Sequence, residues 1–278
     1  MKTFLVTNDS NLKDFTDSVY PQGSFCFFAL LKARDIKVNG VRTGKNMPVK
    51  RGDEVIYYTT AKQESKPSHT VVFEDENIYI ADKFSGVSSE GLFFELSTKG
   101  AIYAVHRLDR NTVGLILFAK NAETEEEMKK AFKERTVTKI YRAVCKNCFK
   151  SDKGVLTGFL VKNAQSAQVK IFRTEKEAFG YGEPLPVRTG YRVLKTSGDR
   201  ALVEVELFTG RTHQIRAHMS SVGCPVLGDT KYGDKLFNKK YSAARQQLVA
   251  KFIRFAFEGG ALEYLDKKSF ESSFDLDI

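Results

Sequence analysis

Alternating apolar and charged side chains give the clearest pattern in the chain. In ALVEVELF, residues 201–208, Val203, Val205 and Leu207 share one face, which predicts a half-buried β-strand. The near-continuous apolar run from Val113 to Ala119 predicts a buried strand. Residues 136–145, TVTKIYRAVC, are rich in β-branched and aromatic side chains and predict another strand. Residues 70–82 predict two short strands around a turn at 75–77.

Two segments instead show helical spacing. Residues 121–135, NAETEEEMKKAFKER, carry acids in the first half and bases in the second, as the helix dipole favours. In RTHQIRAHMSSVG, residues 211–223, Ile215, Met219 and Val222 recur on one helical face, and Gly223 predicts the end of the helix. Polar residues surround that apolar face, so we expect the helix to expose a polar side to a cleft or to solvent.

The first sixty residues have a pattern of their own. Residues 25–31 predict an apolar helix, 36–40 (IKVNG) a strand closing on an Asn39-Gly40 turn, and 55–58 (VIYY) a second strand. A polar stretch without periodicity follows at residues 61–69 and predicts a linker. We therefore expect a small module at residues 1–62 and a larger domain at residues 63–278.

Composition narrows the class of protein. A chain of 278 residues that is 42% hydrophobic can bury a core, which excludes disorder as its main state. The formal net charge of +10 favours a polyanionic partner, nucleic acid first. The start of the chain does not resemble a signal peptide, and no run of about 20 apolar residues could span a membrane. We expect a cytoplasmic monomer without a membrane partner.

Cysteine and histidine spacing argues against a metal centre. Cys145 and Cys148 form a C-x-x-C pair, but no second pair follows, so a zinc ribbon is not expected. His213 and His218 are five residues apart, which separates them by about 140° around a helix. A zinc-binding helix would place two histidines four residues apart. We expect four reduced cysteines and no metal.

Asp109 is the first candidate for chemistry. It lies in His106-Arg107-Leu108-Asp109-Arg110, just before the predicted strand at Val113. Neighbouring cations favour an ionised carboxylate, and a loop at the start of a strand presents it on a rigid frame. The alternative is an aspartate in an ordinary ion pair or turn.

A second candidate is Lys139-Ile140-Tyr141-Arg142. A strand tyrosine flanked by cations can stack on a nucleobase while the cations meet phosphates. Residues 129–153 contain nine Lys or Arg and two Asp or Glu. The alternative is a core tyrosine among solvated lysines.

Three sequence motifs, taken in chain order, are long enough to point to one protein family. HRLDRNTVGLILFAK, then KIYRAV, then TGRTHQIRAHMSSVGCPVLGDTKYG resemble the RluA-type pseudouridine synthases over residues 70 to about 235. The resemblance implies an α+β fold, with a catalytic domain built on a mixed, mainly antiparallel sheet behind a small α/β RNA-binding module. It also implies isomerisation of a specific uridine in ribosomal or transfer RNA to pseudouridine. That family uses no metal or cofactor.

The resemblance also assigns roles to residues. It implies that Asp109 is the catalytic carboxylate, that Arg216 pairs with it, and that Tyr141 stacks on the target uracil and helps remove its carbon 5 proton. Whether Asp109 attacks the ribose or removes a ribose proton stays open. Residues expected to bind the substrate or shape its site are Ile215 on the other side of the uracil, Arg107 filling the gap left by the flipped base, and His106, Arg211 and Gln214.

The N-terminal segment carries a shorter resemblance. K-x-R-D-I-x-V-N-G, followed by R-G-D-E-V, is similar to the small RNA-binding module of a ribosomal small-subunit protein. In that module the helix and the turn after it grip the RNA backbone, which here assigns Lys32, Arg34, Lys37 and Arg42. Residues 1–62 hold ten Lys or Arg against six Asp or Glu. The alternative is a solvated basic surface.

The chain departs from the family pattern in two places. Thr112-Val113-Gly114 stands where Thr-Ser-Gly is usual, and Lys83-Phe84-Ser85-Gly86 where Lys-Pro-x-Gly is common. The sequence leaves open which RNA and which uridine are modified. Two other functions stay in view: a non-catalytic RNA-binding or ribosome-assembly factor on the same scaffold, and a metal-free ribonuclease using His213 and Asp109.

Overall fold

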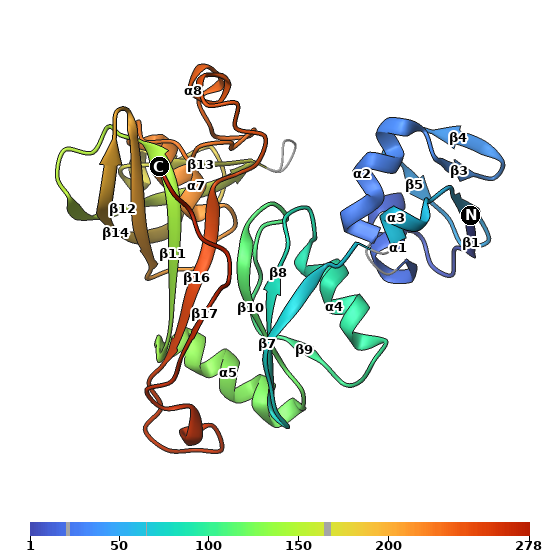
Figure 1. Ribbon diagram of the computed structural model, residues 1–278, viewed down its shortest axis with the longest axis horizontal. Helices are drawn as coiled ribbons and strands as arrows, with labels where there is room; N and C mark the ends of the chain where they lie inside the picture. The colour runs from blue at the N-terminus through green and yellow to red at the C-terminus, as the bar shows by residue number, and fades with distance from the viewer. Residues whose placement is uncertain (21–22, 65, 164–167) are drawn as a thin grey trace. The chain divides into compact units, whose positions relative to one another are not determined.

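The computed structural model describes residues 1–20, 23–64, 66–163 and 168–278. It divides into two compact units: unit 1 comprises residues 1–111 and 117–125, and unit 2 comprises residues 112–116 and 126–278 (Figure 1). The predicted boundary at residues 62 and 63 lies inside unit 1 and stays a prediction.

The first part of unit 1 builds its own sheet. The strands β1 (Lys2–Leu5), β6 (Glu54–Tyr57), β3 (Ile36–Val38) and β4 (Val41–Thr43) pair in this order, all antiparallel. Two helices, α1 (Leu12–Val19) and α2 (Gly23–Ala33), and a pair of short strands, β2 (Ser10–Asn11) and β5 (Pro48–Val49), complete this part. Its core contains Leu12, Phe27, Leu30, Ile36 and Tyr57, each fully buried.

The rest of unit 1 carries the segment around Asp109. After the short helix α3 (Ala61–Glu64), the strands β7 (His69–Glu74) and β8 (Ile78–Lys83) form an antiparallel hairpin. The helix α4 (Ser89–Ser97) follows, with Ser88 capping its first turn through a hydrogen bond from Gly91 N–H. The short strand β9 (Tyr103–Ala104) pairs with the end of β10 (Val113–Ala119).

Unit 2 is built on one sheet with the strand order β13-β12-β14-β15-β11-β16-β10. Every pair in this order is antiparallel except β10 with β16, which is parallel. The strands are β11 (Val137–Lys146), β12 (Lys153–Asn163), β13 (Gln168–Phe172), β14 (Leu185–Ser197), β15 (Arg200–Leu207) and β16 (Leu248–Phe255), and β17 (Ser269–Glu271) adds to the edge of β16. β11 and β16 run side by side (Figure 1).

In the part of the chain that the structure describes, four α-helices and one 3-10 helix belong wholly or partly to unit 2. α5 (Ala122–Glu134) begins in unit 1 and continues into unit 2, and the others are α6 (Glu175–Ala178), α7 (Gln214–Ser221), α8 (Lys235–Lys240) and the 3-10 helix η1 (Glu263–Leu265). Ala217 of α7 packs against Leu160, Val169 and Val187, which come from β12, β13 and β14. The sheet therefore fixes the position of α7, the helix that holds Ile215 and Arg216.

The large, mostly antiparallel sheet with helices confirms the predicted α+β class. The predicted strands and helices also have their counterparts, including the two-residue Asn39-Gly40 turn, where both residues adopt positive φ. The polar residues Gln214, Arg216 and His218 of α7 do not face open solvent: they are buried, and each has hydrogen-bond partners inside unit 2. His218 and Ser221 nevertheless line a cavity, so a polar side of the helix borders a cleft, as expected.

Gly114 marks a close approach that a side chain would prevent. It has φ +107°, and a Cβ built there would lie 2.4 Å from the carbonyl oxygen of Ala250 on β16. This close approach explains why a glycine is present in Thr112-Val113-Gly114.

Among the helices of the described residues, none has both the length and the apolar character needed to cross a membrane.

Candidate active site

The loop that carries Asp109 is anchored on the residue before it. Leu108 is buried, and its backbone N–H donates to Ser89 Oγ at 2.9 Å. The Ser89 hydroxyl in turn donates to the Leu108 carbonyl oxygen at 2.9 Å. Because Ser89 lies in the first turn of α4, one hydroxyl ties both polar groups of this peptide segment to a helix.

The loop is anchored again on the residue after Asp109. The Arg110 carbonyl oxygen accepts hydrogen bonds from Gly86 N–H at 2.9 Å and from Lys83 Nζ at 3.2 Å. Lys83 is fully buried at the end of β8, and its ammonium also donates to the carbonyl oxygens of Phe84 and Val87. The main chain is thus held on both sides of Asp109, which itself is half-buried.

Lys83 also interacts with the charged residues of this loop. Burial lowers the pKa of Lys83 to about 7, while the negative charge of Asp109 acts in the opposite direction and Arg110 lowers it further. Lys83 and Asp109 therefore interact electrostatically within unit 1. The Lys83-Phe84-Ser85-Gly86 segment supports the Asp109 loop even without the family's usual proline.

His106 and Arg107, the two residues of the same motif that precede Leu108, make different contacts. His106 Nε2 accepts a hydrogen bond from Leu117 N–H at 2.9 Å, which ties the start of the loop to β10. Arg107 forms an ion pair with Glu90 at 3.1 Å, and 62% of its side chain is exposed. An exposed pair of this kind contributes little to stability, so Arg107 can exchange Glu90 for another partner.

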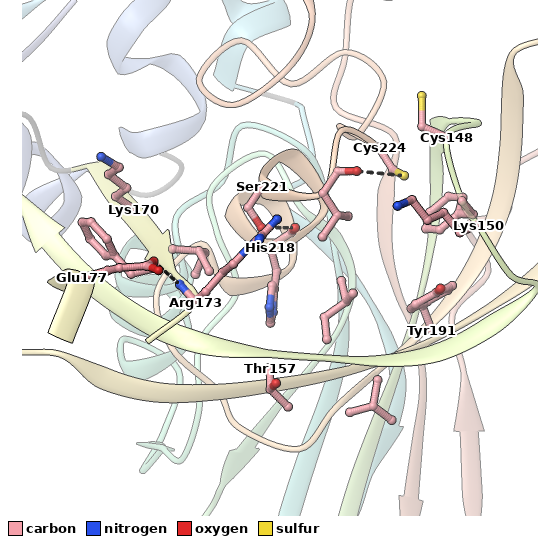
Figure 2. Close-up of a pocket in the computed structure, with 16 residues that line it drawn as sticks. Cys148, Lys150, Thr157, Lys170, Arg173, Glu177, Tyr191, His218, Ser221 and Cys224 are labelled. Carbon is pink, nitrogen blue, oxygen red and sulfur yellow. Dashed lines mark hydrogen bonds between the residues drawn. The ribbon is translucent and has the colours of Figure 1, made fainter. Parts of the chain in front are cut away.

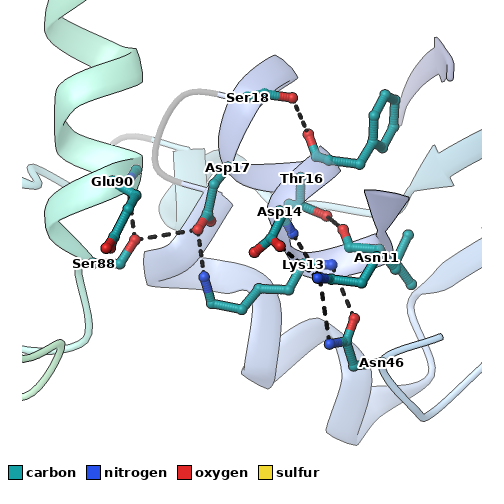
Figure 3. Close-up of polar contacts among 12 residues, drawn as sticks. Asn11, Lys13, Asp14, Thr16, Asp17, Ser18, Asn46, Ser88 and Glu90 are labelled. Atoms are coloured by element: carbon teal, nitrogen blue, oxygen red, sulfur yellow. Dashed lines mark hydrogen bonds and ion pairs between the residues drawn. The ribbon is translucent and has the colours of Figure 1, made fainter. Parts of the chain in front are cut away.

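The N-terminal part of unit 1 reaches the same loop. The Arg110 guanidinium lies 3.8 Å from the centroid of the Phe28 ring on α2. Asp17 of α1 accepts hydrogen bonds from Lys13 Nζ at 2.5 Å and from Ser88 Oγ at 3.2 Å, the hydroxyl that caps α4 (Figure 3). The helices α1 and α2 thus contact both segments that frame Asp109.

In unit 2, Tyr141 lies on β11 between two strands. It is opposite Val205 on β15 and Ala250 on β16, and its side chain is buried. The register with β16 shifts between Ile140 and Tyr141, where one extra residue of β16 makes a bulge. Such a bulge changes the direction of the neighbouring side chains and is common beside active sites.

Arg216 is held by a carboxylate that the sequence reading did not single out. Its Nε donates to Asp229 Oδ2 at 2.7 Å and its Nη2 to Asp229 Oδ1 at 3.0 Å, and both side chains are buried. Burial by itself raises the pKa of Asp229, but hydrogen bonds from Arg216 and its charge, with backbone N–H groups of Tyr232 and Lys231, bring that pKa below its ordinary value. The pair is therefore ionised at neutral pH.

Asp229 accepts from two of the donor positions of Arg216. A guanidinium has five N–H donors in a fixed fork, and Asp229 receives two hydrogen bonds from it. The Arg216 guanidinium also lies 5.1 Å from the centroid of the Tyr232 ring. The predicted pairing of Arg216 with Asp109 stays a prediction.

Gln214 links the start of α7 to the turn before it. Its amide oxygen accepts hydrogen bonds from Thr209 Oγ1 at 2.8 Å and Arg211 N–H at 3.0 Å. Its amide nitrogen donates to the Arg188 carbonyl oxygen and to Thr189 Oγ1. These bonds fix the backbone of Arg211 relative to α7. Next to it, Ile215 is buried.

Arg211 lines a basic cavity of about 600 Å³. The other charged residues around this cavity are Lys133, Arg135, Lys139, Arg188 and Glu206. Burial lowers the pKa of Lys139 to about 8, and its ammonium lies 4.7 Å from the centroid of the Phe132 ring. Five cations against one carboxylate make this cavity suited to a phosphate group.

His213 and His218 have different hydrogen-bond partners. His213 Nδ1 and Tyr232 Oη are 2.9 Å apart, whereas His218 Nδ1 and Thr189 Oγ1 are 3.0 Å apart. Within the described ranges, no three His, Cys, Asp or Glu side chains are grouped so that they could hold a metal ion.

The four cations assigned to the RNA backbone lie at the end of α2 and on the β3–β4 hairpin. Lys32, Arg34 and Arg42 are exposed, and Lys37 is half-buried. Arg42 Nη1 donates to the Arg34 carbonyl oxygen at 2.7 Å and to Asp35 at 3.1 Å. Lys37 and Arg42 both lie over the Tyr58 ring, so this face joins cations to an aromatic side chain.

Sequence reasoning found the residues of the motifs but not the hydrogen bonds that support them. Lys83, Ser89 and Asp229 each hold a predicted site residue or its loop. Ser89 had no signal in the sequence, because its partner Leu108 is 19 residues away. Asp229 did have one, since it falls inside the third family string.

Comparisons with known proteins agree with this geometry. A family model described as RNA pseudouridylate synthase matches residues 49–221. The chain is 29% identical to ribosomal large subunit pseudouridine synthase C of Vibrio cholerae over 76% of this chain and 72% of that protein. It is 35% identical to an uncharacterized RNA pseudouridine synthase of Helicobacter pylori over 76% of this chain and 80% of that one.

A solved structure gives the same result. Human RNA pseudouridylate synthase domain containing 1 superposes with a TM-score of 0.57 at 25% identity, and the match covers 68% of this chain and 79% of that one. Together with the family strings and the sheet that carries them, these matches show that the chain belongs to the RNA pseudouridylate synthase family, in its RluA-type branch.

Proposed function

We propose that this pseudouridine synthase acts on a uridine of large-subunit ribosomal RNA and that Asp109 is its catalytic carboxylate. The observation that carries the proposal is the double anchoring of the loop. Ser89 fixes Leu108, and Lys83 with Gly86 fixes Arg110, so the aspartate between them is presented by a rigid main chain. Preorganisation of this kind is what a catalytic side chain requires.

The reaction is an isomerisation, so no atom is gained or lost. The bond between uracil nitrogen 1 and the ribose breaks, the base turns over, and a bond forms from carbon 5 to the same ribose carbon. Carbon 5 then loses its proton and nitrogen 1 takes one up, so the atoms balance. Asp109 acts either as the nucleophile at the ribose or as the base that removes a ribose proton. In both cases water must stay away from the detached base.

The other predicted residues complete this chemistry. A uridine stacked in RNA is out of reach, so the target base is flipped out. In our proposal Tyr141 stacks on it and assists at carbon 5, Ile215 covers its other side, and Arg216 pairs with Asp109. Arg107 fills the space that the base leaves, for which its exposed side chain and weak partner Glu90 are suited.

The choice of RNA rests on relatives and on charge. Relatives in Vibrio and Rickettsia carry the name ribosomal large subunit pseudouridine synthase C. We propose that residues 1–62 act as an RNA-binding module through Lys32, Arg34, Lys37 and Arg42, of which Lys37 is half-buried and the other three are exposed. Their contacts with phosphates would release counterions and drive binding.

The test compares wild-type protein with Asp109→Asn on deproteinised ribosomal RNA and on bulk transfer RNA. We expect pseudouridine at one or a few positions of the large-subunit RNA with the wild type and none with Asp109→Asn. Asp152→Asn, which neutralises an exposed aspartate, serves as the matched control and should behave as wild type. Chemical mapping of pseudouridine and mass spectrometry of the RNA give the readout.

Each other outcome overturns a different part of the proposal. Pseudouridine formed by Asp109→Asn would remove Asp109 from the chemistry. Modification of transfer RNA alone would overturn the ribosomal target. Cleaved RNA would point to a ribonuclease, and unchanged RNA with tight binding to a non-catalytic RNA-binding factor.

A further inference from the structure

A second groove of unit 2 lies beside the C-terminal half of α7. It has a volume of about 1000 Å³ and is lined by the loop after β11, by β12, β13 and β14, and by α7 itself. Figure 2 shows Lys170 and Arg173 at one end, Lys150 and Tyr191 at the other, and His218 and Ser221 of α7 between them. We call it the α7 groove.

The groove is cationic, and its cations are not neutralised within the protein. Lys150, Lys170 and Arg173 are exposed, and none of them forms an ion pair with any described residue. The one carboxylate in the lining, Glu177, accepts a hydrogen bond from the backbone N–H of Arg173 at 3.1 Å. Three cations against one acid favour an anionic ligand.

Aromatic rings accompany the cations at both ends. The ring centroids of Tyr191 and of Phe149, which precedes Lys150 in the chain, lie 5.0 Å apart. At the other end Lys170 lies 4.8 Å from the centroid of Phe172 and 5.0 Å from that of Tyr181. Cations that meet phosphates, next to rings on which bases stack, are the elements of a single-strand nucleic-acid site.

The α7 groove is distinct from the surroundings of Arg216 and Tyr141. The lining, as far as the chain is described, includes neither of them. Successive helical residues turn by about 100°, so Arg216 and His218 point about 160° apart. One face of α7 therefore serves Arg216, and another borders the groove.

We propose that the α7 groove binds a single-stranded stretch of the RNA substrate outside the target uridine. Two cation–aromatic groups at opposite ends suit consecutive nucleotides of a strand better than one small molecule. Small-molecule pockets are mainly apolar, whereas this groove is rich in polar and charged groups. The inference rests on RNA being the substrate and extends it to a second contact.

Binding of a labelled oligouridylate of twelve nucleotides tests the proposal on the full-length protein. The variant Lys150→Ala/Lys170→Ala removes one cation from each end of the groove. The control Lys235→Ala/Lys239→Ala removes two exposed lysines of α8, which do not line it. Fluorescence anisotropy over a series of KCl concentrations gives the affinity and its salt slope.

We expect the groove variant to bind about tenfold more weakly at low salt, with a salt slope reduced by about 1.4, because each single-strand phosphate contact contributes about 0.7. The control should match the wild type. Equal slopes for all three proteins would overturn the proposal. So would full competition by uridine monophosphate at micromolar concentration, which would indicate a mononucleotide site.

Photocrosslinking with 4-thiouridine in the same oligonucleotide gives a second, positional readout. We expect crosslinked peptides that contain Phe149, Tyr191 or residues of β13, and their loss in Tyr191→Leu. Crosslinks elsewhere only would contradict the assignment. Neither readout needs turnover, so absent pseudouridine would count against the proposed function and leave this inference to be judged on its own data.

Discussion

Asp109 in unit 1 and Arg216 in unit 2 are held in place by opposite means. Around Asp109 the protein fixes the main chain, through Ser89 on Leu108 and Lys83 on Arg110. Arg216 is fixed through its own side chain by a two-bond ion pair with Asp229. Main-chain anchoring suits a carboxylate that must react, and side-chain anchoring suits a cation that must only stay oriented.

Because Arg216 is anchored through its side chain, we expect the substitution of Asp229 to lower the free energy of unfolding more than the other substitutions below. Asp229→Asn leaves the buried Arg216 charge without its carboxylate and weakens the bonds to the Lys231 and Tyr232 N–H groups. We expect a loss of about 3–5 kcal/mol in the free energy of unfolding. Urea denaturation at pH 7 measures it, with exposed Asp152→Asn as control. A loss equal to that of the control would show that the pair does not anchor α7.

Removing the anchor of Leu108 should cost less and affect catalysis more. Ser89→Ala leaves the buried N–H and carbonyl of Leu108 without this partner, for which we expect about 1–3 kcal/mol of destabilisation. The turnover number should also fall while RNA affinity stays, because the loop loses one of its two anchors. Ser97→Ala, at the exposed end of the same helix, is the control. Unchanged turnover would mean that the Lys83 side holds the loop alone.

Lys83 should make stability depend on pH. Its folded-state pKa of about 7 is below its unfolded value, so above pH 7 the unfolded state binds more protons and stability rises with pH. From pH 7 to pH 8 this group should add about 1 kcal/mol to the free energy of unfolding. Lys83→Met should lack that gain in parallel denaturation series. An equal rise in both proteins would contradict a buried, titrating Lys83.

We expect the smallest effect on folding from substitutions of the basic residues Lys32 and Lys37 in residues 1–62. Lys32→Ala/Lys37→Ala should leave the free energy of unfolding unchanged, yet weaken binding of ribosomal RNA a few-fold. The salt slope should fall by about 1.5, because each phosphate contact contributes about 0.7–0.9. Lys45→Ala/Lys50→Ala removes the same charge elsewhere in this part of the chain. Identical salt slopes for both variants would remove the assigned role of Lys32 and Lys37.

Local pattern was enough to predict most elements. The alternation at residues 201–208, the apolar run at Val113–Ala119 and the Asn39-Gly40 turn are encoded within a few residues, and each appears in the fold. The motifs shared with the family supplied the candidate site residues, which stay predictions. The short helix α3 inside the predicted linker shows the limit of composition alone.

The supports of the site could not be predicted in the same way. Ser89 and Leu108 are 19 residues apart, and Lys83 and Arg110 are 27 apart, so nothing in the local pattern joins them. The same holds for the buried polar side of α7. Whether Gln214 or His218 faces solvent depends on Thr189 of β14, a partner that only the folded sheet supplies.

Turnover and stability of Asp109→Asn, measured on the same preparation, test the central claim most directly. The account predicts that pseudouridine formation disappears while the free energy of unfolding and the RNA affinity stay close to wild type, because hydrogen bonds to the main chain of Leu108 and Arg110 anchor the loop. Turnover that survives in folded Asp109→Asn would contradict it.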